Sequence, residues 1–530
     1  MLFTSYGFIA FLAVIIMLYY LVPRKWQWGL LLFGSYVFYF FSGWSNLLYL
    51  AAATLSTYVT ALVIGKRQAA DAAYMAAHKA ELSREERKAH KEAEKAKQRR
   101  VMVLGILLAI GMLAAVKYTN FMIANINGVL SLLHSPARLS FLDIMLPMGI
   151  SFYVFQSAGY LIDVYRGKTK AEGNLFRFAL FVSFFPQLVQ GPISRYDDLA
   201  EGLYAEHPFD KKNVAFGLQR VLWGYFKKMV IADRLLTAVT AIIGVPEVYG
   251  GAFVFAGMVL YAVELYCDFT GGIDITIGIA RTLGIKVAEN FVRPYFSKNL
   301  KEFWNRWHIT MGTWFTDYIF YPVSVSRFML KVSRGARKHL GDAVGKRVPV
   351  YLSCLIVWSA TGIWHGASWN FIVWGLGNCI VLLISQELEP FYRWFHAHVK
   401  VRGSRLWDAF CVGRTLLIVS VLRLFDCYRN VPLTFRMFGS MVTADNWSGL
   451  FDGRLLELGL SGTDYMVAGL GTLLVLGVSL LQRRKSVRER IAALPYPLRF
   501  LLWYGLFLLV LLFGAYGIGY DASQFIYNQF

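Results

Sequence analysis

Two histidines in apolar surroundings are the residues of this sequence best suited to chemistry. They lie within the stretch Asn290–Asn370, where His308 ends the segment Phe303-Trp304-Asn305-Arg306-Trp307-His308 and His365 lies in Thr361-Gly362-Ile363-Trp364-His365-Gly366. An ionisable side chain at membrane depth is energetically costly, so it is a candidate functional residue by default. Histidine also titrates near neutral pH, which suits it to proton transfer. The two histidines are therefore the predicted centre of the site.

Polar and aromatic neighbours could support the two histidines. If Trp304–His308 is helical, Asn305 and His308 share one face of that helix. If the histidines assist a reaction in which an oxygen becomes negatively charged, hydrogen-bond donors are needed to stabilise that charge. The backbone amides near Gly366 could supply some of these donors. The predicted catalytic residues are His365 and His308, and the predicted supporting or cavity residues are Asn305, Trp304, Arg306, Asp317, Trp364, Gly366, Asp268 and Gln187.

Each of these residues also has a purely structural interpretation. Either histidine could be a hydrogen-bonded residue between two packed helices. Asp317 lies close to basic segments and could simply pair with an arginine. The tryptophans and tyrosines could form an interfacial belt or the wall of a cavity.

The composition predicts the elements that must position these residues. Of the whole chain, 57% is hydrophobic and 16% is charged, whereas soluble proteins contain about 25% charged residues. The runs Leu2–Val22, Asn46–Ile64 and Leu498–Ile518 approach the roughly 20 residues needed to span a membrane. Shorter apolar runs lie at Val101–Val116, Ala252–Tyr266, Val350–Ile363, Phe371–Ile384 and Val467–Leu481. We therefore predict an all-α polytopic membrane protein with about 11 to 13 transmembrane or re-entrant helices around a central cavity or tunnel.

The basic residues predict an orientation in the membrane. The net charge is +21, and the Lys and Arg residues cluster between apolar runs, as the positive-inside rule describes, so no nucleic-acid partner is predicted. Lys66–Arg100 is predicted to be a charged cytoplasmic insertion that is helical over Glu81–Arg100. Counting spans back from it places the N-terminus outside and makes Leu2–Val22 a retained helix. Arg327–Arg347 is also predicted to be cytoplasmic.

The chain is predicted to form one membrane domain over residues 1–530. Its predicted parts are N-terminal helices (1–65), the charged cytoplasmic helical insertion (66–100), a catalytic core (101–425) and C-terminal helices (426–530).

Two stretches combine apolar residues with helix-breaking ones. Phe181–Arg195 contains two prolines and a glycine, and Tyr266–Pro294 contains Asp268, Gly271 and Asp274 before its closing proline. Broken backbone at membrane depth is tolerated only where it is buried in protein or lines a cavity. Both stretches are therefore predicted to interrupt helices and to wall a central cavity, although a transporter would show similar features.

Motifs of other chemistries are absent from the sequence. It contains no G-x-S-x-G, H-E-x-x-H or C-x-x-C, which disfavours a serine hydrolase, a zinc protease and a dithiol site. His396-Ala397-His398 lies in a basic segment and is interpreted as exposed. No metal site is predicted.

A set of short segments, in this order, resembles the membrane-bound O-acyltransferases, and within them the bacterial branch of alginate O-acetyltransferases and teichoic acid D-alanyl transfer proteins. The segments are Phe185-Pro186-Gln187-Leu188-Val189-Gln190-Gly191-Pro192-Ile193, Asp268-Phe269-Thr270-Gly271, Asn290-Phe291 with Pro294-Tyr295, Phe303-Trp304-Asn305-Arg306-Trp307-His308-Ile309-Thr310, Trp314-Phe315-Thr316-Asp317-Tyr318, Thr361-Gly362-Ile363-Trp364-His365-Gly366 and Phe525-Ile526-Tyr527-Asn528-Gln529-Phe530.

The resemblance implies the fold of that family and an acyl group moved from a cytoplasmic thioester donor to a hydroxyl at or beyond the outer face. His365 matches the family's essential histidine and His308 its second, supporting polar position. A histidine base would take the hydroxyl proton as the oxygen attacks the thioester carbonyl. The implied donor is acetyl-coenzyme A or an acyl carrier protein thioester, with no tightly bound cofactor.

The resemblance also implies partners and a location. The implied partners are an extracellular or periplasmic acyltransferase protein, a possible cytoplasmic acyl carrier protein and membrane lipid. The implied location is the cell membrane, which the chain crosses several times.

The sequence departs from the family pattern in two places, which leaves the acceptor open. Val323–Arg327 replaces the usual Leu-Gly-Gly turn, and Gly272 stands where an aromatic residue is common. Acetylation of a polysaccharide or cell-wall polymer is the first interpretation, and D-alanyl transfer to teichoic acid is the second. A different class, a transporter or flippase, would use buried Glu264, Asp268 and Asp274 to carry ions or protons.

Overall fold

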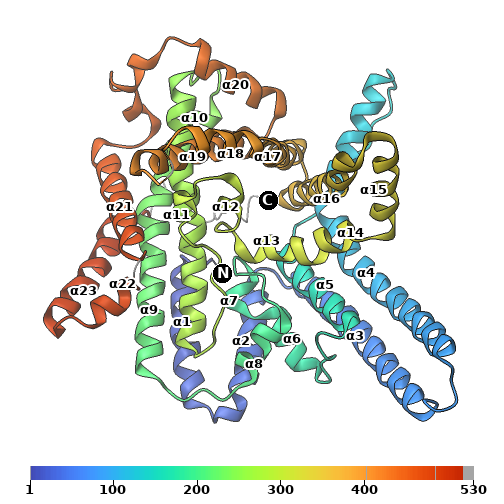
Figure 1. Ribbon diagram of the computed structural model, residues 1–530. Helices are drawn as coiled ribbons and strands as arrows, with labels where there is room; N and C mark the ends of the chain where they lie inside the picture. The colour runs from blue at the N-terminus through green and yellow to red at the C-terminus, as the bar shows by residue number, and fades with distance from the viewer. Residues whose placement is uncertain (1, 402, 484, 517–530) are drawn as a thin grey trace. The chain divides into compact units, whose positions relative to one another are not determined.

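Helices make up nearly all of the regular structure of this protein. The computed structural model describes residues 2–401, 403–483 and 485–516 (Figure 1). In these ranges no strand forms, apart from an isolated bridge between Phe291 and Trp307. The predicted all-α architecture is confirmed. The C-terminal segment Phe525–Phe530, which contributed to the family resemblance, lies outside the described residues.

The chain forms two compact units. The first comprises the chain up to Gly217 together with Ile279–Ala288, and the second comprises Leu218–Gly278 and the chain from Glu289 onward. The helices that begin in the first unit are α1 (Tyr6–Leu21), η1 (Arg24–Trp26), α2 (Gln27–Phe40), α3 (Asn46–Ala77), α4 (Arg84–Leu132), α5 (Ile150–Arg166), α6 (Leu175–Ser183), α7 (Phe185–Leu188), α8 (Tyr196–Tyr204) and α9 (Lys211–Tyr225).

The charged insertion, residues 66–100, consists of the end of α3, a turn and the beginning of α4. Helices α3 and α4 pack side by side (Figure 1), and the chain reverses between them at residues 78–83. Ser83 caps α4 in a capping box with Glu86, which satisfies backbone donors that a helix start would leave unpaired. The predicted helix over Glu81–Arg100 thus exists from Arg84. The apolar run Val101–Val116 belongs to the same 49-residue helix.

An irregular segment precedes α5. Helix α5 begins at Ile150, and the residues from 135 to 147 have no regular structure. Gly149 precedes α5 with φ +72°, and a Cβ there would lie 2.0 Å from the carbonyl oxygen of Leu188. Only glycine fits such a left-handed, crowded position, so it fixes where the helix starts.

The predicted break over Phe181–Arg195 is confirmed. Helix α6 ends at Ser183, α7 is four residues long, and the chain then runs without a helix to Arg195. The side chain of Gln187 donates to the hydroxyl of Ser194 over 2.8 Å. All of these residues except Arg195 are buried, as expected for irregular backbone within a membrane protein.

The helices of the second unit follow the same pattern of long spans joined by short turns. They are η2 (Phe226–Ala232), α10 (Asp233–Gly244), α11 (Ala252–Thr282), η3 (Pro294–Phe296), α12 (Leu300–Trp304), α13 (Ile309–Phe315), η4 (Thr316–Phe320), α14 (Tyr321–Ser324), α15 (Arg327–Leu340), α16 (Asp342–His365), α17 (Trp369–Glu387), α18 (Glu389–His398), α19 (Arg405–Tyr428), α20 (Val431–Thr443), η5 (Trp447–Leu450), η6 (Arg454–Leu458), α21 (Gly462–Leu481), α22 (Val487–Ala492) and α23 (Tyr496–Phe513).

The predicted break over Tyr266–Pro294 is wrong for its first half. Helix α11 runs without interruption through Asp268, Gly271 and Asp274, and the chain becomes irregular only after Thr282. A Cβ on Gly224 of α9 would lie 2.6 Å from the carbonyl oxygen of Gly271. The glycines in this stretch therefore allow two helices to approach closely rather than break one of them.

Seven described helices are long and apolar enough to cross a membrane. They are α3, α4, α11, α16, α17, α21 and α23, and α1 is a shorter apolar helix of 16 residues. The chain is therefore a multi-pass membrane protein. The boundaries predicted at residues 65, 100 and 425 fall inside the continuous helices α3, α4 and α19.

Candidate active site

His308 lies in a tight turn and not in a helix. Helix α12 ends at Trp304, α13 begins at Ile309, and His308 has a left-handed backbone with φ +48°. Asn305 and His308 therefore do not share the face of one helix, because the helical condition for that arrangement is not met. The turn is held by pairing with a distant segment, since the amide of Ile309 donates to the carbonyl of Asn290 over 3.0 Å.

Asn290 fixes the orientation of the His308 ring. Its side-chain oxygen accepts from both the backbone amide and the hydroxyl of Thr310, each over 3.0 Å. This leaves its amide nitrogen to donate to Nδ1 of His308 over 3.2 Å. The contact of Nδ1 with this nitrogen is shorter than its 3.4 Å contact with the side-chain oxygen of Asn290, so we assign Nδ1 as the acceptor and the proton of a neutral His308 to Nε2. His308 is thereby prepared to donate a hydrogen bond from Nε2.

The surroundings of His308 favour this neutral form. The side chain is 1% exposed. Burial, with a smaller contribution from the charge of Arg423, lowers the pKa of His308 to about 3. A group with such a pKa is a poor proton acceptor at neutral pH, so His308 is better suited to stabilise negative charge than to act as the base.

His365 is the last residue of α16. Its ring contacts Trp374 edge-on, with centroids 4.6 Å apart, and lies 6.4 Å from the ring of Phe371. A Cβ on Gly366 would lie 2.2 Å from the Phe371 ring, and one on Gly362 would lie 2.5 Å from the Phe371 carbonyl oxygen. These two glycines therefore let α16 and α17 approach closely enough to enclose the imidazole.

The indole of Trp364 packs near both histidines. Its ring centroid is 5.9 Å from that of His308 and 5.1 Å from that of His365. The two imidazoles can be no further apart than the sum of these distances. The structure thus brings together two histidines that are 57 positions apart in the sequence.

A buried arginine, which the sequence analysis did not single out, stabilises the same cluster. Arg423 of α19 is 6% exposed and donates to Asp426 over 2.7 Å. Its guanidinium also lies over three indoles, at 4.9 Å from Trp374, 5.5 Å from Trp307 and 5.9 Å from Trp304. The sequence does contain a signal for this buried ion pair, namely an arginine followed three residues later by an aspartate inside an apolar run.

A cavity of about 1520 Å³ borders the site. This exceeds the roughly 300 to 1,000 Å³ of typical small-molecule pockets. Three of the predicted supporting residues line it: Trp304, Asn305 and Asp317. Neither histidine is among the lining residues, but Trp307 and Ile309 beside His308 and Thr361 of α16 are. The histidines therefore lie immediately behind the wall of this cavity.

The other predicted residues have different surroundings. Arg306 forms an ion pair with Glu302 over 2.6 Å. Asp268 is fully buried and pairs with Lys228 over 2.5 Å, while its neighbour Phe269 packs edge-on to His308 at 5.0 Å. Gln187 belongs to the other unit of the chain.

Comparison with known proteins is consistent with this geometry. The model of the membrane-bound O-acyltransferase family (MBOAT) matches residues 172–334. A probable alginate O-acetylase of Azotobacter vinelandii is 33% identical over 454 residues, which cover 84% of this chain and 79% of that protein. The chain belongs to the membrane-bound O-acyltransferase family.

Two further relatives of this membrane-bound O-acyltransferase have different names. A peptidoglycan O-acetyltransferase of Helicobacter pylori is 31% identical, over 58% of this chain and 59% of that protein. A teichoic acid D-alanyltransferase of Bacillus subtilis is 27% identical, over 47% of this chain and 61% of that protein. The chain is thus an O-acyltransferase, and the transporter interpretation is not supported.

We expect Arg423 to act as a positioning residue in this O-acyltransferase. Arg423→Gln removes the charge that disfavours protonation of His308 and loosens the three indoles. Acyl transfer should therefore fall at least about tenfold, and the acidic limb of its pH profile should move to higher pH. Arg423→Lys should keep the wild-type pH profile while losing rate, because it retains the charge but not the planar group.

The control for Arg423 is Arg436→Gln, since Arg436 is exposed and pairs with Glu247 on the surface. This variant should match the wild type in both rate and pH profile. An Arg423→Gln variant with an unchanged pH profile would show that its charge does not act on His308.

The depressed pKa of His308 predicts an acid-sensitive fold. The unfolded chain binds a proton at this histidine below about pH 6.5, whereas the folded chain does so only near pH 3. Stability should therefore decrease as the pH falls below about 6.5, by at most about 1.4 kcal/mol per pH unit from this group. His308→Asn, which tolerates the left-handed backbone, should show a shallower decrease. The measurement is thermal unfolding in detergent from pH 7.5 to pH 4.5, with His398→Asn as the exposed control. Identical slopes for both variants would contradict this account.

Proposed function

We propose that this protein moves an acetyl group from a thioester donor on the cytoplasmic side across the membrane, for O-acetylation of an extracellular polysaccharide or cell-wall polymer. The observation that carries the proposal is the pair of buried histidines that both pack against Trp364, directly behind the wall of a large cavity. The similarity to a probable alginate O-acetylase over most of both chains supports the acetyl group and a polysaccharide acceptor.

In the proposed reaction His365 is the general base. It takes the proton of the attacking hydroxyl while the hydroxyl oxygen bonds to the thioester carbonyl carbon. The C–S bond then breaks, and the protonated His365 returns the proton to the leaving thiolate. The products are the acetyl ester and a free thiol, so atoms and charges balance. A position at the C-terminal end of α16 suits this role, because that end of a helix stabilises a cation.

His308 would stabilise the oxyanion that forms in this step. Its hydrogen bond from Asn290 places the proton on Nε2, where it can be donated to the developing negative charge. Loss of one such donor typically reduces the rate about 10²–10³-fold. Asn305 lines the cavity and could supply a further donor.

The donor is either acetyl-coenzyme A or an acyl carrier protein thioester. The cavity beside the histidines is large enough for the arm that carries the thioester. An outer-face partner protein would pass the acetyl group onward, as the family resemblance implies. D-alanyl transfer is the second candidate, supported by the similarity to a teichoic acid D-alanyltransferase over about half of the chain.

Replacing each histidine separately tests the two proposed roles, because loss of the base should lower the rate more than loss of the oxyanion donor. His365→Ala should lower acetyl transfer at least about 10²–10⁴-fold, because the base is lost. His308→Ala should also impair transfer but retain a measurable rate. The assay follows labelled acetyl groups from acetyl-coenzyme A, or from an acetylated carrier protein, into the polymer, with and without the outer-face partner.

Two matched controls make this test interpretable. His398→Ala changes an exposed histidine of α18 and should keep the wild-type rate. Folding of each variant is checked by size-exclusion chromatography in detergent. A folded His365→Ala protein that retains most of its transfer activity would refute the proposed base.

We also propose that the N-terminus faces outward and that residues 66–100 and 327–347 face the cytoplasm. Both segments carry an excess of Lys and Arg, as cytoplasmic segments do. Single cysteines placed at exposed positions of either segment should resist an impermeant thiol reagent on intact cells and react after lysis. A cysteine before Tyr6 should react on intact cells. Strong labelling of either basic segment from outside would reverse this orientation.

A further inference from the structure

A second cavity, of about 650 Å³, lies among the C-terminal helices of the second unit. Much of its wall is aliphatic and comes from α21 and α23, which are both candidate membrane spans. The aliphatic lining residues from these two helices are Leu474, Val475, Val478, Leu501, Leu502, Leu506 and Leu509. Such a wall suits a hydrocarbon chain.

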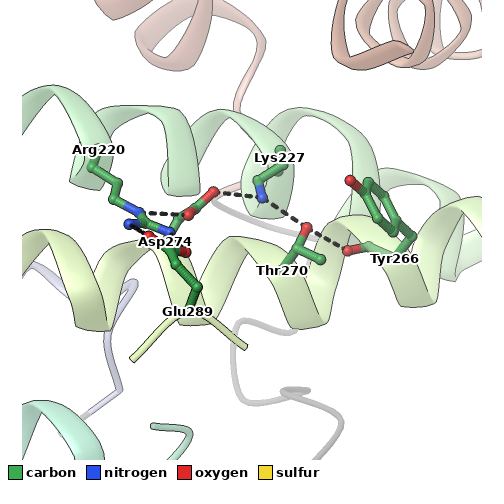
Figure 2. A network of polar contacts seen from close by, with 6 residues as sticks. All are labelled: Arg220, Lys227, Tyr266, Thr270, Asp274 and Glu289. Atoms are coloured by element: carbon green, nitrogen blue, oxygen red, sulfur yellow. Dashed lines mark hydrogen bonds and ion pairs between the residues drawn. The ribbon is translucent and has the colours of Figure 1, made fainter. Parts of the chain in front are cut away.

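The opposite wall of this cavity is an ionic network (Figure 2). Arg220 donates to Asp274 over 2.7 Å and binds Glu289 through two bonds of 2.6 Å each. Lys227 also reaches Asp274 over 2.7 Å and donates to the hydroxyl of Thr270 over 2.7 Å. All of these residues line the cavity. The cavity is therefore amphipathic, with a charged side and a hydrocarbon side.

The cavity lining carries more positive than negative charge. In addition to the network, Arg293 and Arg488 line it, so four basic residues face two acidic ones. Both carboxylates are already engaged by Arg220 and Lys227. Within the described part of the chain, Arg293 forms no ion pair. An anionic ligand would therefore complement this lining.

Two polar atoms of the lining residues also lack a protein partner. Nε1 of Trp503 and Oε1 of Gln219 are buried and make no hydrogen bond within the described residues. A buried polar atom without a partner is costly, and a bound polar group can satisfy it. One of these atoms is a donor and the other an acceptor, which suits a ligand that offers both, such as a phosphate ester bearing hydroxyl groups.

We propose that this cavity binds one anionic phospholipid, with a phosphodiester and a hydroxylated headgroup such as that of phosphatidylglycerol. The phosphate faces Arg293 and Arg488, where the turn after α21 carries several basic residues. One acyl chain lies along Leu502, Leu506 and Leu509 of α23. Basic pockets between membrane helices are suited to anionic headgroups.

Packed aromatic rings connect this cavity with the surroundings of His308. Phe291 lines the lipid cavity and packs edge-on to Trp307 at 5.0 Å, next to His308 in the sequence. The inference of lipid binding does not depend on the proposed acetyl transfer, because it is tested by a binding measurement.

Filling the cavity is the sharpest test of this inference. Gly505 of α23 lines the cavity, and a Cβ there would meet no atom within 4 Å. Gly505→Leu should therefore occupy the space of the acyl chain without a clash and lower retention of phosphatidylglycerol at least about tenfold. The control is Gly477→Leu, since Gly477 of α21 also has open space but does not line the cavity.

The measurement is native mass spectrometry of the purified full-length protein after exchange into detergent with defined lipids. Wild type and Gly477→Leu should each retain one phosphatidylglycerol in preference to phosphatidylcholine or phosphatidylethanolamine. Wild-type retention by Gly505→Leu would overturn the proposal, as would equal retention of all three lipids.

The headgroup contact is tested with a second pair of variants. Arg293→Gln should weaken retention of phosphatidylglycerol about fivefold, the typical effect of one basic residue near an anionic lipid. Arg490→Gln, which removes an exposed arginine that does not line the cavity, should have no effect. Equal effects of these two variants would show that only general surface charge attracts the lipid.

Discussion

The buried charge of Arg423 is the constraint on which the active-site region depends. An unpaired guanidinium within apolar helices would be strongly destabilising. Here Asp426 supplies the counter-charge, and the faces of Trp304, Trp307 and Trp374 surround the rest of the group. The three indoles come from α12, from the turn after it and from α17. A single arginine therefore fixes the relative positions of the elements that surround both histidines.

This arrangement makes the two histidines chemically different. His308 is held by Asn290 with its proton on Nε2, and burial and the charge of Arg423 lower its pKa. His365 lies at the C-terminal end of α16, where a helix favours positive charge. One histidine is thus suited to donate a hydrogen bond and the other to accept a proton. Both rings pack against Trp364, which keeps the two histidines close together.

The sequence was sufficient to predict those features that depend on local residue types. Apolar helices such as α3 and α23 and the break around Pro186 could be predicted from composition and prolines. Short motifs also pointed to His308 and His365, which both pack against Trp364. The left-handed turn at His308 could not, because it is stabilised by pairing with residues 290–292, far along the chain. The uninterrupted course of α11 was missed because a glycine can indicate either a break or a close helix contact. Gly271 serves the second purpose, which only the position of Gly224 reveals.

Two acidic residues of α11, Asp268 and Asp274, have a structural explanation in this fold. Lys227 and Lys228 are consecutive in the π-helical turn η2, yet they pair with two carboxylates six positions apart, Asp274 and Asp268 respectively. Asp274 is also bound by Arg220, and Lys228 also pairs with Asp233. The two lysines therefore belong to an ionic network that fastens η2 to α11. Breaking such a buried pair costs about 3–5 kcal/mol. Carrying ions through these positions would require repeated breaking of the contacts that join the helices. Their geometry instead suits a rigid support for the helices that carry the aromatic cluster. Rigidity matters here because catalysis of acyl transfer requires hydrogen-bond donors in fixed positions.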